Sequence, residues 1–318
     1  MTTSTFSGTS PRIRGREDLL LTFRSGEKPA ERWRVGTEHE KFGFLRESGQ
    51  PLPYEGPRGI RAVLEQFISR FGWQAMMEGE TLIALNRGGA SITLEPGGQL
   101  ELGGAPLAST HEAQAELDQH LAELGAISQD LNLVWLNVGR TPIVPSAKMP
   151  WMPKERYAIM GRYLPTQGSM ARDMMVGTCT VQTNLDYASE ADMALKLRVA
   201  LAAGPLINAL YANSPFAEGR PTGMLSTRAE VWRHTDPHRC GVPDVVFREG
   251  FGYEAWAEYA LDVPMFFIHR GGHYVDTSGR SFREFLARGI GGEWPTQEDW
   301  VLHLTTLFPE ARLKSYIE

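Results

Sequence analysis

The sequence has 318 residues, of which 42% are hydrophobic and 22% are charged, and its formal net charge is −6 at pH 7. These values are typical of a globular protein with one large domain or two ordinary ones, and they argue against nucleic acid as the main partner. The two cysteines are too few for a disulfide framework, which fits a reducing compartment, and we predict a cytoplasmic location.

The N-terminal sixteen residues are rich in Ser and Thr, carry Arg12, Arg14 and Arg16, and contain no acidic residue. This composition occurs in transit peptides, and it also occurs in short disordered tails. We interpret residues 1–16 as a disordered tail that precedes a single catalytic domain at 17–318.

A membrane span needs roughly 18 consecutive apolar residues, and no run in the sequence reaches that length. The longest candidate, residues 199–212, is interrupted by Gly204 and Pro205. We therefore predict that the protein has no membrane partner.

The first half of the chain combines one helix with several strands. Apolar residues at helical spacing between Pro57 and Gly72 predict an amphipathic helix, with proline near its start and glycine after its end. Alternating or β-branched residues predict strands at 33–45, 81–86, 90–95 and 99–102. The short loop Arg87-Gly88-Gly89 joins two of these strands and is typical of a β-hairpin.

In the second half, two helices have recognisable starts. Ser109 and Glu112 form a capping-box pattern before a helix at 109–128, and Ser189 with Asp192 marks the start of a further helix. Further strands are predicted at 131–138 and 178–187, and residues 265–276 form a hairpin that turns at Gly271-Gly272. Short hairpins favour antiparallel sheet, so the predicted class is α+β, with helices packed on one face of the sheet.

Familiar nucleotide and hydrolase motifs are absent from the sequence. It contains no G-x-x-x-x-G-K-[ST] loop, no G-x-G-x-x-G fingerprint, no H-E-x-x-H and no G-x-S-x-G. These absences weaken P-loop, dinucleotide, zinc-protease and serine-hydrolase interpretations, but they are compatible with ATP bound on the surface of a sheet.

Four acidic residues fall near strand centres, where acids are otherwise depleted. Glu38 and Glu40 share one face of a predicted strand, and adjacent carboxylates repel unless a cation lies between them. Glu95 and Glu101 flank Pro96-Gly97-Gly98, a break that lets backbone approach a ligand closely. A solvated outer face and an ordinary turn are the structural alternatives for these two pairs.

Amides and cations complete the candidate set. Gln182 and Asn184 share one strand face with Asp186, which suits magnesium or phosphate but also fits a polar outer face. Arginine binds both oxygens of a carboxylate or phosphate, so Arg228 and Arg239 are candidates for substrate, although a surface loop explains them too. The same reasoning applies to Lys154 and Arg156. Acids on several strands with cations reaching in suit phosphoryl transfer, which needs metals and charge neutralisation rather than a nucleophile.

The stretch VGTEHEKFGF from Val35 is similar to the opening strand of plant-type and proteobacterial glutamate–cysteine ligases. The resemblance continues in order, from about residue 10 to the last residue, through SITLEPGGQLELGGAPLAS, MPKERYAIM, DMMVGTCTVQTNLDYASEADM, ANSPFAEGRPTG and YALDVPMFF. Several long blocks in sequence are far more specific than a single short motif.

The resemblance implies a curved antiparallel sheet related to glutamine synthetase and the guanido kinases. It implies an enzyme of glutathione synthesis in which ATP phosphorylates the γ-carboxylate of L-glutamate and the amine of L-cysteine then attacks the acyl phosphate. The expected cofactors are ATP and Mg²⁺. Carried onto this sequence, the metal ligands are Glu38, Glu40, Glu95, Glu101 and Glu318, the residues beside metal or nucleotide are Gln182, Asn184, Lys154 and Arg156, and the substrate-binding residues are Arg228 and Arg239.

One departure concerns the end of the chain. Members of the resembled family continue past the position of Glu318 into an Arg-Gly-containing block and a helical segment, whereas this sequence ends at Glu318. We therefore keep two alternatives beside the ligase: a related carboxylate–amine ligase with another acceptor, and a fragment that binds ATP or glutamate without turnover. The expected partners are small molecules only, and the chain is predicted to be a monomer or a homodimer.

Overall fold

The computed structural model describes residues 10–318. Its main feature is a seven-stranded antiparallel sheet in the order β2-β3-β4-β5-β1-β6, with β7 also paired to β1. The strands are β1 (Val35–Leu45), β2 (Gln74–Glu78), β3 (Thr81–Arg87), β4 (Ala90–Leu94), β5 (Leu100–Gly103), β6 (Leu133–Leu136) and β7 (Val181–Leu185). The predicted α+β class with an antiparallel sheet is confirmed.

Strand β1 is the centre of this sheet because it pairs along both edges. Residues 38–41 pair with β5 on one edge, while residues 35–39 pair with β7 and 42–45 with β6. This register places Glu40 opposite Glu101 and Glu38 opposite Gln182.

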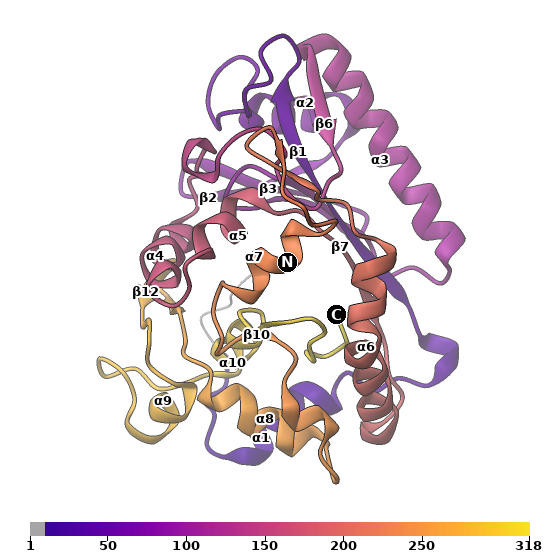
Figure 1. The fold of residues 1–318 in the computed structure, drawn as a ribbon. Coiled ribbons are helices and arrows are strands. Elements are labelled where there is room, and N and C mark those ends of the chain that lie inside the picture. Colours follow the sequence, from indigo (N-terminus) through magenta and orange to yellow (C-terminus); the bar gives the residue numbers. More distant parts are fainter. Residues whose placement is uncertain (1–9) are drawn as a thin grey trace.

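Two long helices pack directly against the sheet, as Figure 1 shows near the top of the molecule: α2 (Ile60–Phe71) and α3 (Thr110–Leu131). Gly72 ends α2 in the left-handed conformation, and the Ser109 side chain accepts a hydrogen bond from the Glu112 N–H at the start of α3. Both helix predictions are confirmed. On the other side of the sheet lie α4 (Glu155–Tyr163), α5 (Ala171–Gly177) and α7 (Thr227–Arg233), so the prediction that helices pack on one face only is wrong.

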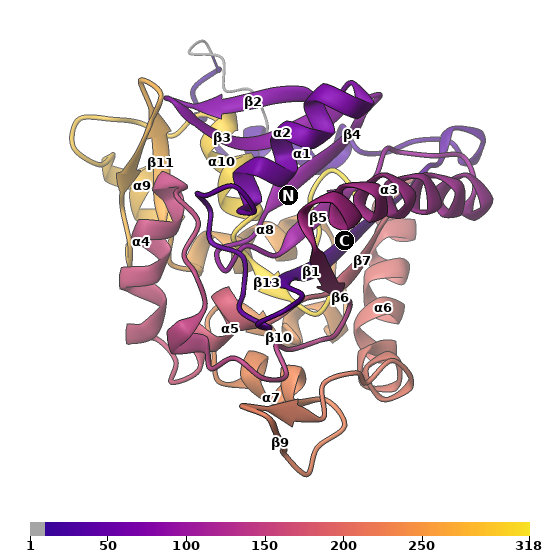
Figure 2. The same ribbon diagram turned by 90° about the horizontal axis from the view of Figure 1, so that it is seen from above.

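A second hydrophobic core lies away from the sheet, around Phe23, Trp256 and Trp300. It is built from α1 (Arg16–Arg24), α6 (Glu190–Leu210), α8 (Tyr253–Asp262), α9 (Phe282–Arg288) and α10 (Gln297–Leu304). Figure 2, turned by 90° from Figure 1, shows α6 at one side of the molecule.

Short elements connect these two cores. The hairpin of β11 (Phe267–Arg270) and β12 (His273–Asp276) turns at the predicted glycine pair. The other short strands are β8 (Phe216–Ala217), β9 (Arg220–Pro221), β10 (Cys240–Gly241) and β13 (Phe308–Pro309), and the 3-10 helices are Ala30–Arg32, Ser146–Lys148, Leu164–Thr166 and Asp244–Phe247. β10 and β13 pair in parallel, which the hairpin pattern did not predict.

The prediction of a disordered tail needs correction where the structure describes it. Residues 1–9 lie outside the described part of the chain, but within residues 10–16 one side chain, that of Ile13, is buried. Ile13 is buried in the second core, and its N–H donates a hydrogen bond to the Pro295 carbonyl oxygen at 2.9 Å. The Ser- and Arg-rich composition concealed one apolar residue that holds this segment to the protein.

Candidate functional site

Five predicted metal ligands come together beside the centre of the sheet; we call them the acid cluster: Glu38, Glu40, Glu95, Glu101 and Glu318. Glu38 and Glu40 share one face of β1, and Glu101 lies opposite Glu40 on β5. Glu318 follows Ile317, which pairs with Leu185 at the end of β7. The cluster is built from segments far apart in the sequence.

The Pro-Gly-Gly break determines how Glu95 joins the cluster. The Glu95 N–H donates to the Gln99 carbonyl oxygen at 2.9 Å, which closes the β4–β5 turn. The buried Gln99 side chain accepts from the Gly97 N–H at 2.9 Å and donates to the Thr178 carbonyl oxygen at 2.8 Å. A Cβ on Gly97 would clash with the Val176 carbonyl oxygen, so only glycine fits there.

Glu38 is held by the two predicted amides of β7. Gln182 Nε2 donates to one carboxylate oxygen at 2.8 Å, and Asn184 Nδ2 donates to the other at 3.0 Å. Asn184 Oδ1 is buried without a hydrogen-bond partner, which leaves one hard oxygen acceptor facing an enclosed region. The amides therefore orient Glu38 and add an unused acceptor.

The acid cluster is strained electrostatically. Burial, with repulsion from Glu95 and Glu101, holds the pKa of Glu40 well above its usual range. Burial and the neighbouring Glu101 raise the pKa of Glu95 to about 7. Glu101 differs from these two: burial disfavours its ionised form, but its contacts with Thr93, Glu38 and Lys154 help to lower its pKa to about 2. Carboxylates in this state favour any cation that can lie between them.

Three predicted cations lie beside the cluster. Lys154 is buried and donates to the Leu94 carbonyl oxygen at 2.8 Å, and burial with repulsion from Arg156 lowers its pKa to about 7. Arg156 and Lys154 both counteract the rise in the pKa of Glu95. Burial lowers the pKa of Arg228, Glu40 opposes this, and the Arg228 Nε is buried without a hydrogen-bond partner.

Arg312 and Lys314 were not among the predicted residues, yet both form ion pairs with Glu318. Burial alone would raise the pKa of Glu318, but these two cations hold it well below its usual range. Thr93, also not predicted, donates its hydroxyl to Glu101. The alternation of Arg312 and Lys314 shortly before Glu318 was the signal that could have identified them.

The structure places Arg239 elsewhere. Its side chain is fully buried, and all three guanidinium nitrogens are used, by Asp236, the Thr306 carbonyl and the Pro264 carbonyl. With each guanidinium nitrogen already engaged in this buried network, Arg239 is poorly placed to bind a substrate carboxylate. Asp186 also lies outside the cluster, because Lys28 and the Arg34 N–H occupy it.

The donor set of the acid cluster fits Mg²⁺. Magnesium prefers hard oxygen ligands, and it is usually held by one or two carboxylates while substrate phosphates and water supply the rest. Within residues 10–318, no three or more His, Cys, Asp or Glu side chains are grouped so that they alone could hold a metal ion. Paired carboxylates and an unused amide oxygen are what a cation shared with a phosphate ligand requires.

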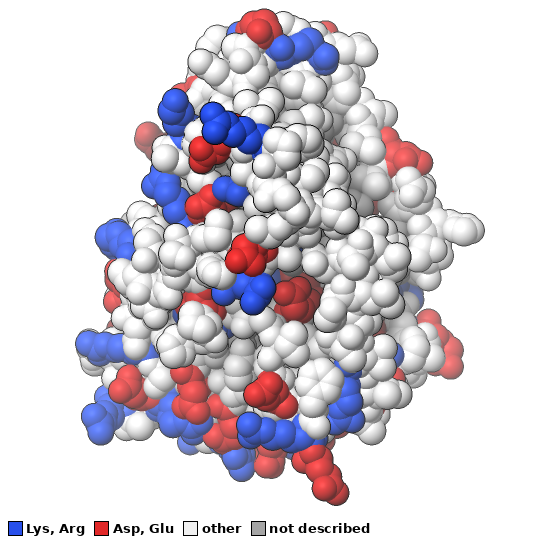
Figure 3. Space-filling view, viewed as in Figure 1, with Lys and Arg blue, Asp and Glu red and all other residues white. Residues whose placement is uncertain are grey.

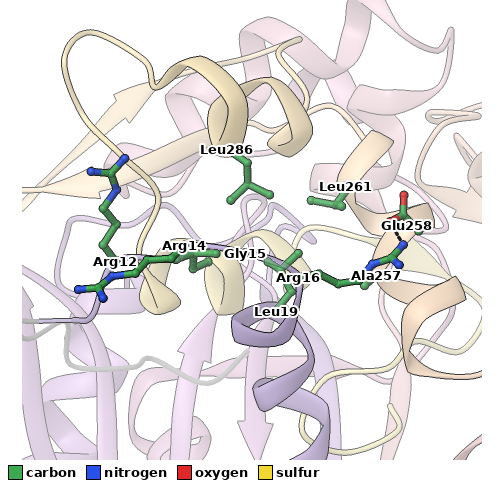
Figure 4. Close-up of a pocket in the computed structure, with 10 residues that line it drawn as sticks. Arg12, Arg14, Gly15, Arg16, Leu19, Ala257, Glu258, Leu261 and Leu286 are labelled. Carbon is green, nitrogen blue, oxygen red and sulfur yellow. Dashed lines mark hydrogen bonds and ion pairs between the residues drawn. The ribbon is translucent and has the colours of Figure 1, made fainter.

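A separate surface cavity of about 500 Å³ lies between the N-terminal segment and α8 and α9. Figure 4 shows Arg16 paired with Glu258 at one end, and Leu19, Leu261 and Leu286 around the middle. None of the predicted site residues lines it. The cavity therefore says nothing about the acid cluster.

Fold and site together define a class: an α+β protein with buried carboxylates, amides and cations on an antiparallel sheet, arranged as cation-dependent phosphoryl chemistry requires. Residues 34–318 match the model of glutamate-cysteine ligase family 2, and the chain belongs to that family.

Curated relatives agree with this membership. The chain is 49% identical over 306 residues to a chloroplastic glutamate–cysteine ligase of Brassica juncea, covering 95% of this chain and 59% of the relative. It is 48% identical to the Nicotiana tabacum enzyme of the same name and 47% identical to that of Arabidopsis thaliana, in each case covering 95% of this chain and 58% of the relative. The chain thus spans about three fifths of the length of the curated relatives that it matches.

The predicted cytoplasmic location is wrong, because the relatives are named as chloroplastic proteins. The prediction depended on the low cysteine count, which indicates a reducing environment. A reducing environment does not distinguish the cytosol from other reducing compartments.

Proposed function

We propose that this chain carries the ATP-dependent glutamate–cysteine ligase site, joining the γ-carboxylate of L-glutamate to the amine of L-cysteine. The observation that carries this proposal is the convergence of five glutamates, of which Glu38 and Glu101 are buried, with two amides and three cations, in a chain of this family. We further propose that the sheet is of the curved type found in glutamine synthetase and the guanido kinases.

In the proposed reaction, a γ-carboxylate oxygen of glutamate attacks the terminal phosphorus of ATP, and ADP leaves. The cysteine amine then attacks the carbonyl carbon of the acyl phosphate, inorganic phosphate leaves, and the amine loses a proton. Both steps bring anions together, so positioning and charge neutralisation are what the protein must supply.

We assign the binding of Mg²⁺ to Glu38, Glu40, Glu95, Glu101 and Glu318, with Asn184 Oδ1 as a further oxygen donor. The ion, when bound, neutralises and orients the phosphate oxygens. Gln182 and Asn184 keep Glu38 in one orientation through their hydrogen bonds at 2.8 and 3.0 Å. This fixed orientation reduces the reorganisation that binding requires.

The cations have separate roles in this proposal. Lys154 and Arg156 lie beside Glu95 and neutralise phosphate oxygens of ATP. Arg228, whose Nε lacks a hydrogen-bond partner and which faces Glu40, binds a substrate carboxylate or the transferred phosphate. Arg239 has no role in the site, because its donors are used within the second core.

The test is phosphate release from ATP with glutamate and Mg²⁺, with and without cysteine, together with detection of γ-glutamylcysteine by mass spectrometry. Cysteine-dependent release with that product supports the ligase. Release with another amine and none with cysteine identifies a related carboxylate–amine ligase.

A matched pair of variants gives this assay its control. Glu38→Gln removes one charge with little change of shape and is expected to abolish phosphate release. Arg283→Ala breaks only exposed ion pairs with Glu258 and Asp262 and should leave release unchanged. A folded protein that binds ATP but never releases phosphate would contradict the ligase proposal and favour the binding-only alternative.

A further inference from the structure

Gln99 is a buried amide in the turn between β4 and β5, and it is not itself a member of the acid cluster. Its side chain bonds only to backbone groups. Oε1 accepts from the Gly97 N–H at 2.9 Å, and Nε2 donates to the carbonyl oxygens of Met175 at 3.2 Å and Thr178 at 2.8 Å. A side-chain amide carries an acceptor and two donor hydrogens on one planar group, so this arrangement uses what glutamine offers.

The bond to Gly97 helps to shape the turn that joins two acids of the cluster. The Glu95 N–H donates to the Gln99 carbonyl oxygen at 2.9 Å, and the Gly98 N–H donates to the Glu95 carbonyl oxygen at 2.9 Å. Glu95 begins this turn, and Glu101 follows it on β5. The conformation of the turn therefore determines how these two carboxylates lie relative to each other.

The two donations from Gln99 hold a different segment. Met175 lies in the last turn of α5, where backbone carbonyls lack partners within the helix, so one donation caps that helix. Thr178 directly follows α5, and Thr180 comes two residues later. The Thr180 N–H donates to the Glu40 carboxylate at 3.0 Å, and the Glu40 N–H donates to the Thr180 carbonyl oxygen at 3.1 Å. One amide thus connects the turn at Gly97 to the segment that holds Glu40.

We propose that Gln99 is a positioning residue of the candidate site, whose side chain fixes the turn between Glu95 and Glu101 against the segment that holds Glu40. The inference rests on the proposed function, because it concerns how the proposed Mg²⁺ ligands are placed. Glu95 and Glu101 repel the Glu40 carboxylate, so the two segments interact directly. Acidic and basic groups also lie close together near the middle of the face drawn in Figure 3.

Gln99→Glu separates the two connections. An ionised glutamate still accepts from the Gly97 N–H, but it donates to neither carbonyl oxygen. The added negative charge alone would attract Mg²⁺ and lower the Mg²⁺ concentration that gives half-maximal phosphate release. Loss of positioning should instead raise that concentration by about tenfold or more, as is typical for groups behind metal ligands. The sign of the change distinguishes positioning from charge.

Two further variants complete the comparison. Gln99→Met removes all three hydrogen bonds without adding a charge, and it should raise the Mg²⁺ requirement as well. Gln297→Glu is the matched control, because Gln297 Nε2 also donates to a backbone carbonyl oxygen, that of Asp18, at 2.5 Å between α10 and α1. It should leave the Mg²⁺ requirement unchanged. A merely structural Gln99 would lower the stability of its variants but not change their Mg²⁺ requirement, and circular dichroism shows that each is folded at the assay temperature.

Amide hydrogen exchange, measured by mass spectrometry, tests the connection without any activity. In Gln99→Glu, residues 178–182 should exchange faster by about tenfold or more, while residues 95–99 keep the protection of wild type. In Gln99→Met both segments should exchange faster, and in Gln297→Glu neither should.

A Mg²⁺ requirement of Gln99→Glu and Gln99→Met that equals or falls below that of wild type would overturn the proposal. So would unchanged exchange over residues 178–182 in both variants. A wild-type protein that releases no phosphate would contradict the proposed function instead, and the exchange measurement would still decide whether Gln99 holds the two segments together.

Discussion

Two buried charged groups in this molecule teach different lessons. In the region around Pro264 and Thr306, which we call the second region, Arg239 lies against Asp236 at 2.7 Å. Its guanidinium also donates to the carbonyl oxygens of Thr306 and Pro264. In the acid cluster, Glu40 and Glu95 have raised pKa values, and Asn184 Oδ1 has no hydrogen-bond partner.

Both groups consist of charged residues that a sequence pattern marks as unusual, but only in the acid cluster is the charge left uncompensated. In a satisfied buried ion pair, each charge is compensated, so the fold is harmed only when one partner is removed. A cluster of mutually repelling carboxylates destabilises the fold until a ligand supplies the missing charge, which is the expected cost of a functional site. Uncompensated charge, and not the burial of charge alone, therefore distinguishes the candidate site.

The largest effect on stability should come from removing Arg239 from its buried ion pair. Arg239→Ala leaves Asp236 buried without its partner, so the free energy of unfolding should fall by about 3–5 kcal/mol. Urea denaturation measures this change. Arg283→Ala, which breaks exposed ion pairs, is the control and should cost less than about 1 kcal/mol. A loss below about 1 kcal/mol for Arg239→Ala would show that the hydrogen bonds of Arg239 contribute little to the stability of the second region.

The second region should also respond to acid through His303. Burial lowers the pKa of His303 to about 4, and its Nε2 bonds the Ala260 carbonyl at 2.7 Å. The unfolded chain takes up a proton near pH 6.5 and the folded chain does not, so the stabilisation is present above pH 6.5 and is lost as the pH falls towards 4. The loss reaches on the order of 3 kcal/mol.

The pH effect is measured as the difference between wild type and His303→Gln in urea denaturation from about pH 7 to about pH 4, the range between the two protonation states. Subtracting the variant removes the contribution of other histidines. Parallel stability curves for the two proteins would contradict the prediction.

Removing a charge from the acid cluster should have the opposite effect and stabilise the fold. Because the pKa of Glu40 is raised, the folded state disfavours its ionised form, and Glu40→Gln should raise the free energy of unfolding at about pH 8 by about 1 kcal/mol or more. The measurement is made without divalent cations. A destabilised Glu40→Gln variant would mean that Arg228 and the Thr180 N–H already compensate this carboxylate.

The smallest expected effect is that of Mg²⁺ alone. Binding to the folded state stabilises it by mass action, by about 0.4 kcal/mol when the free ion equals its dissociation constant. Thermal denaturation of wild type should therefore shift upwards with Mg²⁺, and that of Glu101→Gln should shift less. Equal shifts in both proteins would place the ion elsewhere.

Local sequence signals predicted much of the sheet and several helices. The glycine pair at 88–89, the Gly72 cap and the Ser109 and Ser189 caps correspond to features of the structure, because each acts on its own neighbours. Helices α8, α9 and α10 were not predicted, although Ser281 with Glu284 and Thr296 with Asp299 are capping boxes visible in the sequence. These helices are short, and tertiary packing stabilises them more than their own periodicity does.

The sequence indicated the acids of the candidate site more directly than its cations. Glu38 and Glu40 share a face by strand geometry alone, but the family resemblance was needed to bring Glu95 and Glu318 to them. Whether an arginine has free donors depends on distant carbonyl groups, such as those of Pro264 and Thr306 around Arg239. No local pattern carries that information, which is why the sequence could not show that Arg239 is engaged by Asp236 and two carbonyl groups.

Calorimetric titration with a non-hydrolysable ATP analogue and Mg²⁺ tests most directly whether the acid cluster is a binding site. We predict Mg²⁺-dependent binding to wild type and to Arg283→Ala, and binding weaker by about tenfold or more in Glu101→Gln, because one charge opposite the bound cation is gone. Binding to Glu101→Gln that equals wild type would contradict the account, since the nucleotide and its cation would then lie away from these carboxylates.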